Sequence, residues 1–452
     1  MNRRELFKKL GLATGGLMTA PLYGLDDFGT RQLLPDPHVH SNPAKPITAI
    51  TCGAGNRGNV YGGFAEKYPD QINIVGVAEP IEIRNKRYMA KHNIPKENSF
   101  VTWEHVFDRP KFADAIIITT PDDLHYGPCM AALEKGYDIL LEKPIAPTEQ
   151  ECRDILAMVQ KTGRIVAVCH VLRYAPYFIE LRDLIQAGAV GELISVSHFE
   201  PIQHIHMAHS FVRGNWHNSK ETTPIILAKS CHDLDMLRYL VGKPAKRISA
   251  FGSLKWFHEG NKPAGATPRC MDGCAVEKEC PYSAMKVYYR DRDYTYVFDF
   301  PEDKSKHGEV ILKNLRETNY GRCVYQMDND QCDHYVANIE FEDEVTAAFS
   351  MEAFTSYHGR RTRIMGSHGD IVGDMKKFVH TNFLTSEQTE WNQASDGHGG
   401  GDWRLAADWV QAVSKQDASL LTSTIEASIE SHLMAFAAEK SRLEGTTEQV
   451  KV

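Results

Sequence analysis

The sequence has no long run of charge of one sign, no internal repeat and no low-complexity tract. Its formal net charge is −8 at pH 7. Surfaces that bind nucleic acid or anionic membranes need concentrated Lys and Arg, so the composition argues against both partners. No apolar run is long enough for a spanning helix, so we expect no membrane span in the mature chain. The 452 residues are 42% hydrophobic and 24% charged, which indicates a soluble protein of two domains that binds a small neutral or polar ligand.

Residues 1–25 are predicted to be an export signal. Arg3, Arg4, Lys8 and Lys9 precede an uncharged, mildly apolar stretch at 10–25. The adjacent arginines resemble a twin-arginine signal, so we expect export to the bacterial periplasm. A frayed basic terminus on a cytoplasmic protein is the alternative. Residues 26–46 are polar with several prolines and predict a linker.

A glycine-rich turn follows the first predicted strand, Ile47–Cys52. Gly53 permits a tight turn, Gly55 lets the backbone approach a pyrophosphate, and Gly58 lets the next helix pack closely. The helix N-terminus, with Asn56 and Arg57, offers N–H groups and partial positive charge to phosphates. The order of strand, turn and helix therefore predicts a dinucleotide site, with a purely structural turn as the alternative.

The second predicted strand, Ile72–Ala78, ends in Glu79, which lies 21 residues after Gly58. A carboxylate there accepts hydrogen bonds from the adenosine-ribose hydroxyls and repels a 2′-phosphate. NAD is therefore the predicted cofactor. Arg84, Lys86 and Arg87 lie nearby and leave NADP possible.

Strands and helices keep alternating through residue 175, which predicts a doubly wound parallel sheet over 47–175. Ala115–Thr119, Tyr137–Leu141 and Ile165–Val168 read as further buried strands. Ligands of such sheets bind beyond the carboxyl ends of the strands. The predicted cofactor contacts at those ends are Thr120, Pro121, His125, Glu142, Lys143 and Arg173.

Residues 176–452 predict an α/β domain with an open, mostly antiparallel sheet. Glu192–Phe199 and Arg247–Trp256 read as strands, and two hairpins follow within 334–375. The uncovered face of such a sheet could join copies of the chain into a homo-oligomer. Two predicted helices, Trp403–Lys415 and Ile425–Leu443, either cover part of this sheet or return to the first domain.

Three polar segments of the second domain are candidates for the substrate site. His232 could take a proton from an alcohol, and a nearby carboxylate could orient its ring. Asp235 is a candidate substrate contact, and a capped helix with a core histidine is the alternative. Four histidines between Gln203 and His217 could suggest a metal, but their spacing shows no convergent ligand set, so we expect a polar loop and no metal. Trp216 could stack on a sugar or pack in the core. The glycines after His398 either deliver that histidine to the cleft or merely precede a helix capped by Asp402.

The cysteines leave several states open. Cys270, Cys274 and Cys280 form a cluster in a predicted loop, with Cys323 farther along the chain. They could form disulfides if the protein is exported, bind zinc, or stay reduced. A catalytic thiol is disfavoured because no activating base has a recognisable spacing.

Together these motifs resemble the glucose-fructose oxidoreductase, inositol dehydrogenase and MocA (Gfo/Idh/MocA) family. The resemblance rests on the glycine turn, the segment from Thr120 to His125, Glu142-Lys143-Pro144, Arg173, and the motif from His232 to Asp235. It implies NAD(P) bound at the glycine turn, Lys143 on the reacting hydroxyl and His232 as general base. Many members have an Asp four residues before that histidine, where this chain has Ala228, so Lys229 is a candidate substitute group or a substrate anchor. A lysine beside His232 would lower the pKa of the imidazole.

The resulting expectation is an oxidoreductase that moves hydride between nicotinamide and a secondary alcohol of a sugar, glycoside or cyclitol. The alternative is a glycosidase that retains NAD and acts by oxidation, elimination, addition and reduction. A binding protein without activity would be expected to have lost Lys143 or His232, and both are present. Which sugar is used, and whether the cofactor exchanges, stay open.

Overall fold

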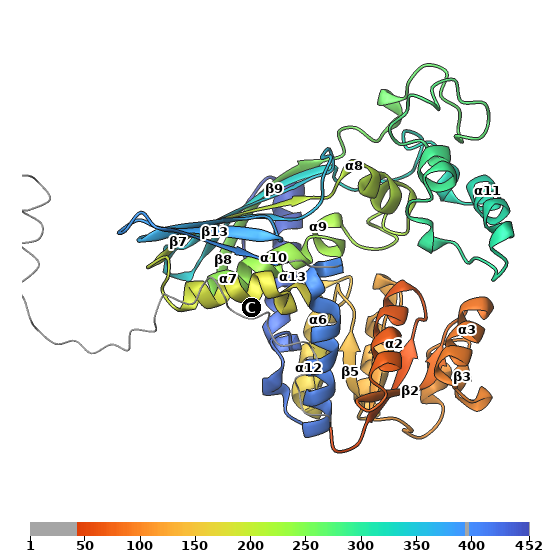
Figure 1. Ribbon diagram of the computed structural model, residues 1–452, viewed down its shortest axis with the longest axis horizontal. Helices are drawn as coiled ribbons and strands as arrows, with labels where there is room; N and C mark the ends of the chain where they lie inside the picture. Colours follow the sequence, from red (N-terminus) through yellow and green to blue (C-terminus); the bar gives the residue numbers. More distant parts are fainter. Residues whose placement is uncertain (1–42, 394–396, 452) are drawn as a thin grey trace, which may run out of the picture. The chain divides into compact units, whose positions relative to one another are not determined.

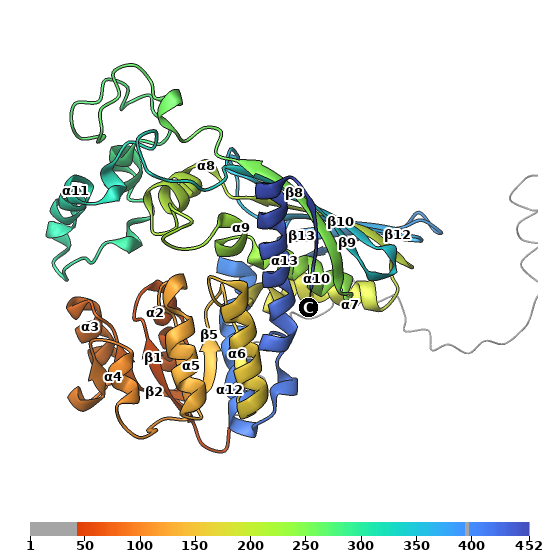
Figure 2. The same cartoon turned by 180° about the vertical axis from the view of Figure 1, so that it is seen from behind.

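The computed structural model describes residues 43–393 and 397–451, and these residues form two β-sheets with covering helices (Figures 1 and 2). The predicted export signal and residues 26–42 of the predicted linker lie outside the described residues. Within the described part of the chain, no helix combines the length and the apolar character that crossing a membrane would require.

The first sheet has six parallel strands in the order β3-β2-β1-β4-β5-β6, which is the doubly wound arrangement predicted for 47–175. The strands are β1 (Ile47–Cys52), β2 (Ile72–Ala78), β3 (Ser99–Phe100), β4 (Ala115–Ile118), β5 (Asp138–Leu141) and β6 (Val166–Val168). The helices between them are α2 (Asn56–Lys67), α3 (Glu82–His92), α4 (Glu104–Phe107), α5 (Tyr126–Glu134) and α6 (Glu149–Thr162). Every residue of β4 is buried, because helices cover both faces of the sheet.

Each end of α6 has a local cause. The Thr148 hydroxyl accepts a hydrogen bond from the Glu151 N–H at 3.2 Å and donates to the Glu151 carboxylate at 2.7 Å, which is a capping box. Gly163 ends the helix with φ +64°, a conformation that glycine adopts without steric cost.

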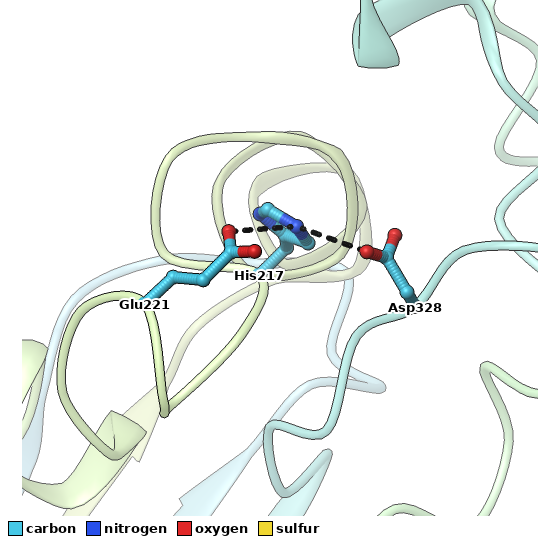
Figure 3. Close-up of side chains that lie close together, drawn as sticks. All are labelled: His217, Glu221 and Asp328. Atoms are coloured by element: carbon cyan, nitrogen blue, oxygen red, sulfur yellow. Dashed lines mark ion pairs between the residues drawn. The ribbon is translucent and has the colours of Figure 1, made fainter.

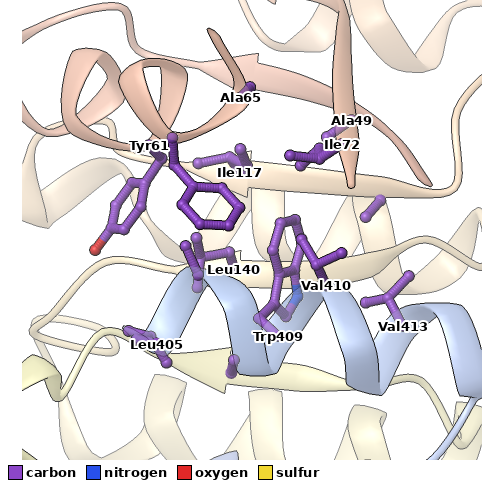
Figure 4. Close-up of a cluster of buried hydrophobic side chains, with 14 of the residues drawn as sticks. Ala49, Tyr61, Ala65, Ile72, Ile117, Leu140, Leu405, Trp409, Val410 and Val413 are labelled. Atoms are coloured by element: carbon purple, nitrogen blue, oxygen red, sulfur yellow. The ribbon is translucent and has the colours of Figure 1, made fainter. Parts of the chain in front are cut away.

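The core of the first domain includes a helix from the far end of the chain. α12 (Gly401–Lys415) contacts α2 and β1, and its Trp409 is 1% exposed among side chains of the parallel sheet (Figure 4). Residues from both ends of the described chain share this cluster, including Tyr61, Leu140, Trp409 and Val410. The dinucleotide domain is therefore not one continuous stretch of sequence.

The second sheet has nine strands in the order β14-β13-β12-β11-β7-β10-β9-β8-β15. Its strands are β7 (Leu193–Pro201), β8 (Ala245–Ser253), β9 (His334–Phe341), β10 (Thr346–Glu352), β11 (Arg361–Gly366), β12 (Gly369–Gly373), β13 (Lys377–Asn382), β14 (Gln388–Asn392) and β15 (Thr447–Gln449). β7 and β10 pair in parallel, and the other neighbours pair antiparallel, so the expectation of a mostly antiparallel sheet is confirmed.

Three helices pack on one face of this second sheet: α7 (Pro176–Gln186), α10 (Cys231–Val241) and α13 (Ile425–Glu444) (Figure 1). Side chains on the opposite face are exposed, including the paired Phe251 and Val336 at 64% and 47%. The predicted open face is therefore present.

A long segment between β8 and β9, residues 254–333, forms an irregular insertion with its own small core. Its longest helix is α11 (His307–Glu317). The buried members of this core are Ala284, Val287, Tyr288, Phe298, Ile311 and Leu315. Sequence patterns did not predict this unit, because its apolar residues follow no regular period.

Candidate active site

The glycine turn has the geometry that a dinucleotide requires. Gly53 has φ +96°, and a Cβ there would lie 2.5 Å from the Thr119 carbonyl oxygen. A Cβ on Gly58 would lie 2.2 Å from the Gly53 carbonyl oxygen, so the close packing of α2 depends on that glycine. A Cβ on Gly55 would meet nothing closer than the Arg84 Nη1 at 4.0 Å. The approach to Gly55 is therefore open, as a pyrophosphate site needs.

The N-terminus of α2 also suits phosphate. Gly55 is the N-cap, no side chain caps the helix, and its first turn holds no acidic residue. The first N–H groups and the helix dipole can therefore serve an anion. Asn56 is exposed at this end.

Glu79 is buried beside the glycine turn, where its carboxylate accepts from the N–H of Ala54 at 2.7 Å and of Ile81 at 2.9 Å. A carboxylate has about four acceptor sites, so capacity remains for ribose hydroxyls. Arg84, which could favour a 2′-phosphate, forms an ion pair with Asp299 of the insertion at 2.8 Å. This pairing fits the predicted preference for NAD.

Thr120 and His125 brace the strand end with their own hydrogen bonds. The Thr120 hydroxyl donates to the Leu124 carbonyl at 2.9 Å. The ring nitrogens of His125 contact the carbonyl oxygens of Thr120 at 3.0 Å and of Pro144 at 2.6 Å. Both residues therefore position the two loops after β4 and β5. Pro121 lies between them at the start of the same turn.

A chain of ion pairs joins the glycine turn to α12. Arg57 donates to Glu142 at 2.5 Å, to the Tyr61 hydroxyl at 2.7 Å and to Asp402 at 2.6 Å. Burial alone would raise the pKa of Glu142, but the charges of Arg57 and Lys143 hold that pKa below its ordinary value. Arg57 and Glu142, predicted as cofactor contacts, are thus bound to each other near that site.

Lys143 and His232 lie close together. The Lys143 ammonium group donates to the Ala228 carbonyl oxygen at 2.8 Å, so the main chain at this position anchors the lysine. His232, on α10, is 4% exposed, and its Nδ1 has no hydrogen-bond partner. Burial, and then the charge of Lys143, hold the pKa of His232 well below its ordinary value. The imidazole is therefore neutral and can accept a proton at neutral pH.

His398 joins this pair from the glycine-rich loop. Its ring centroid lies 6.0 Å from that of His232, and its Nδ1 lies 3.0 Å from the Asp402 carboxylate. Gly400 is the N-cap of α12, so Asp402 does not cap the helix as the alternative proposed. The loop delivers His398 beside His232. Asp402, which the sequence did not single out as a site residue, holds both His398 and Arg57.

Lys229 is paired with a carboxylate beside the site. Its ammonium group pairs with Glu200 at 3.1 Å, and Arg360 binds both Glu200 at 3.1 Å and Asp233 at 2.5 Å. The largest contributions to the low pKa of His232 come from burial and from other charges, not from Lys229. Lys229 is fixed in a neighbouring buried network of charges, so its expected role as a substitute proton-transfer group has no support in this geometry.

Arg173 and Asp235 form an interior pair. The guanidinium donates to the carboxylate at 2.8 and 2.6 Å and also to the backbone carbonyls of Thr422 and Ala427. Asp235 is fully buried, and Arg173 is 5% exposed. The structure therefore makes them a brace between domains and corrects the expectation that they contact cofactor and substrate directly.

Trp216 is half-buried, and its indole N–H donates to Asp122 at 2.8 Å. The residue thus bridges the second domain to the turn after β4. Phe211 lies 6.0 Å from it, centroid to centroid, so one part of the indole packs against an aromatic ring.

The histidines between Gln203 and His217 do not form one metal site. His209 contacts the Tyr288 hydroxyl at 2.8 Å, whereas His217 faces Glu221 at 3.6 Å and Asp328 at 3.8 Å (Figure 3). This last trio is the one group of three possible ligands within 4.8 Å of one another among the described residues. Both of its carboxylates are exposed.

Comparison with known proteins agrees with this geometry. The family "Oxidoreductase family, NAD-binding Rossmann fold" (GFO_IDH_MocA) matches residues 47–170, and "Oxidoreductase family, C-terminal alpha/beta domain" matches residues 182–452. A putative oxidoreductase of Bacillus subtilis, YteT, is 25% identical over 370 residues, covering 76% of this chain and 83% of that protein. The scyllo-inositol 2-dehydrogenase (NAD(+)) of the same organism is 30% identical over 141 residues, 31% of this chain and 39% of that one.

Among solved structures, a levoglucosan dehydrogenase in complex with NADH and levoglucosan has the same fold. The TM-score is 0.66 at 16% identity, and the match covers 90% of this chain and 100% of that one. The chain therefore belongs to the Gfo/Idh/MocA family of NAD(P)-dependent oxidoreductases, with an NAD-binding Rossmann domain followed by the family's C-terminal α/β domain.

Proposed function

We propose that this oxidoreductase acts on a CH–OH group of a sugar, glycoside or cyclitol. The observation that carries the proposal is the neutral, buried His232, whose Nδ1 has no partner, beside the Lys143 ammonium group. A cation and a base at one place suit an alcohol that loses a proton as hydride leaves. The relatives named for inositol and levoglucosan support a polyhydroxylated substrate.

The residues have distinct roles in this proposal. Gly53, Gly55, Gly58 and Glu79 would hold NAD, which supplies the hydride acceptor when bound. Lys143 binds the reacting hydroxyl oxygen and stabilises the negative charge that develops there. His232 takes the hydroxyl proton, because its neutral form is the populated one.

His398 and Trp216 are proposed to bind the rest of the substrate. The His398 side chain is 42% exposed, yet Asp402 fixes its ring beside His232. Trp216 is held by Asp122, so its ring is already oriented. Fixed polar and aromatic groups of this kind bind sugars with little loss of side-chain entropy.

The test is a spectrophotometric assay of Lys143→Met. The purified enzyme with NAD and a panel of glycosides and cyclitols should give rising NADH absorbance at about 340 nm. Lys143→Met should lower kcat/KM by a factor of about 100 or more, because the developing charge loses its partner. Lys161→Met, at an exposed position of α6, is the matched control and should leave the rate unchanged. Full turnover by Lys143→Met would contradict the proposed mechanism.

A second candidate function is a glycosidase that retains its NAD through oxidation, elimination, addition and reduction. The contact of the insertion with α3 favours it. Asp299 pairs with Arg84, and the Phe300 carbonyl accepts from Arg87, so the insertion reaches the neighbourhood of Glu79. Dissociation of the dinucleotide would be slowed if this contact had to open.

The same assay separates the two activities. Release of aglycone with no net NADH, or with at most one equivalent per chain, identifies the glycosidase. NADH that accumulates over many turnovers with added NAD identifies the dehydrogenase and excludes a glycosidase that retains its NAD.

We also propose that the exposed face of the second sheet joins two copies of the chain. Phe251 and Val336 are paired across β8 and β9 and are exposed. Light scattering after size exclusion should give twice the chain mass for the wild type and the chain mass for Phe251→Lys. A monomeric wild-type protein would reject this arrangement.

A further inference from the structure

The insertion brings four cysteines together around one small cavity, far from the dinucleotide turn in sequence and not used by the proposed reaction. Cys270, Cys274, Cys280 and Cys323 all line this cavity, together with Arg213. The three segments that meet here are 263–280, 323–325 and the end of the π-helix η5 (Met207–Arg213). The cluster therefore depends on the folded insertion and is not a consequence of sequence proximity alone.

Backbone hydrogen bonds fix the segments that carry these cysteines. Cys270 donates its N–H to the Gly321 carbonyl at 3.2 Å, and Cys323 donates its N–H to the Pro268 carbonyl at 2.8 Å. These two bonds flank an antiparallel bridge between Arg269 and Arg322. Successive turns then lead the chain from Cys270 back to the cavity at Cys274 and Cys280.

Burial raises the pKa of the Cys280 and Cys323 thiols, and hydrogen-bond donors and a cation around the sulfurs offset part of that rise. The Ala284 N–H donates to the Cys270 Sγ at 3.4 Å, and backbone groups of Tyr282 and Tyr325 hydrogen-bond to Cys280 and Cys323. The Arg213 guanidinium lies 3.9 Å from the Cys270 Sγ. N–H donors and a cation around cysteine sulfurs are the outer partners that orient metal ligands and offset their charge.

Arg213 itself is nearly inaccessible, at 2% exposure, and donates to the carbonyls of Arg322 and Tyr282 at 2.8 Å each. Among the described residues, its hydrogen-bond partners are backbone carbonyls and a cysteine sulfur, and none is a carboxylate. A buried guanidinium normally has an anion nearby. Thiolates on the adjacent cysteines would supply that anion.

The ten cysteines of the chain are all free in this structure, so the four are not joined as disulfides. No three of their sulfurs lie within 4.8 Å of one another, since the one such group of possible ligands is His217, Glu221 and Asp328. Tetrahedral zinc with Zn–S bonds of about 2.3 Å holds its sulfurs about 3.8 Å apart. Ion binding would therefore draw the loop inward, whereas an iron–sulfur cluster accommodates a wider set of sulfurs.

We propose that Cys270, Cys274, Cys280 and Cys323 form a metal site with four thiolate ligands. Such ligands select soft centres, namely Zn²⁺ or an iron–sulfur cluster. Each thiol that binds releases its proton to solvent, so four thiolates and Zn²⁺ leave a net charge of −2, which Arg213 offsets in part. Zinc binding needs no redox step, whereas an iron–sulfur cluster would need iron and sulfide supplied from outside the chain.

The site has a structural consequence for the substrate region. η5 carries both Arg213, at the cysteines, and His209, whose ring contacts the Tyr288 hydroxyl at 2.8 Å and lies 4.5 Å from the Tyr294 ring, centroid to centroid. The metal would thus hold the insertion, including Asp299 on Arg84, in one position. Its role is positioning and does not extend to the reaction itself.

Metal analysis of the full-length enzyme, purified anaerobically with a reductant, is the first experiment. We expect about one Zn²⁺ per chain, or iron together with acid-labile sulfide and visible absorbance, which distinguishes the two centres. Alkylation followed by mass spectrometry should show these four thiols protected until a chelator is added. Metal-free protein whose four thiols alkylate at once, or protein in which they are found as disulfides, would overturn the proposal.

Variants give an independent check. Cys274→Ser and Cys280→Ser should each lower the metal content at least tenfold and increase proteolysis within 254–333. Cys332→Ser is the matched control, because Cys332 is buried in the same insertion but does not line the cavity. Equal metal content in all three variants would refute the assignment. If the first two fail to fold, chelation of the wild-type enzyme tests the same point.

Discussion

Asp402→Asn removes one charge from the network that links the glycine turn to His398. Asp402 binds Arg57 at 2.6 Å and His398 at 3.0 Å, and its side chain is 17% exposed. Burial would raise the pKa of Asp402, but His398 and Arg57 lower it from 3.8 to about 2. The difference of about 1.8 pKa units corresponds to about 2 kcal/mol of folding free energy.

The sign of the pH dependence follows from the lowered pKa. The Asp402 carboxylate stabilises the folded state fully above the unfolded pKa of 3.8, and this stabilisation is lost as the pH falls towards about 2. Urea unfolding should therefore give a variant about 2 kcal/mol less stable than the wild type at pH 7, with roughly half that difference at pH 3. Activity should also fall, because His398 loses the partner that orients it.

Asp108→Asn is the matched control, since Asp108 is exposed at the end of α4. It should change stability by less than about 0.5 kcal/mol. A double variant with Arg57→Met should be less destabilised than the sum of the two single variants, because both remove the same ion pair. A loss below about 0.5 kcal/mol for Asp402→Asn at pH 7, or a loss of equal size at pH 3, would refute this account of the network.

Three further outcomes are expected. Gly58→Ala should abolish NAD binding in calorimetry and destabilise the fold by about 1–3 kcal/mol, because the new Cβ would lie 2.2 Å from the Gly53 carbonyl oxygen. Normal affinity for NAD would contradict this turn geometry. Asp235→Asn should lower the free energy of unfolding in urea by about 3–5 kcal/mol, since it leaves the Arg173 charge buried without its counter-ion. An unchanged free energy of unfolding would mean that water reaches this pair. The rate of alcohol oxidation should stay constant from pH 7 down through pH 6.5, because the pKa of His232 is well below 6.5. A midpoint at 6.5 would contradict the lowered pKa that burial and Lys143 give to His232.

The sequence predicted the first domain well because its signals are local. β1 and β2 have the predicted boundaries, since a parallel strand buried on both faces is a continuous apolar run. The roles of Gly53 and Gly58 were also predictable, because each reflects one steric requirement at one position. The open antiparallel sheet followed from alternation in its hairpins.

Other features leave no such local signal. Every residue of β14 is exposed or only half-buried, so the strand has no apolar pattern to detect. Arg57 and Asp402 are 345 positions apart, and the charge of one says nothing about the other. The partner of Lys229 was unpredictable for the same reason. Lys229 lies three residues before His232 in the sequence, but in space it pairs with Glu200.

The packing of α12 into the dinucleotide domain has a consequence for biosynthesis. β1 to β6 are complete by residue 168, whereas Leu405, Trp409 and Val410, which cover part of their core, are translated more than two hundred residues later. A nascent chain therefore exposes that apolar surface while the second domain is being made, and chaperone contact is expected at this stage. Asp402, the partner of Arg57, also arrives with α12. The ion pair that fixes Arg57 beside the glycine turn therefore forms only in finished chains.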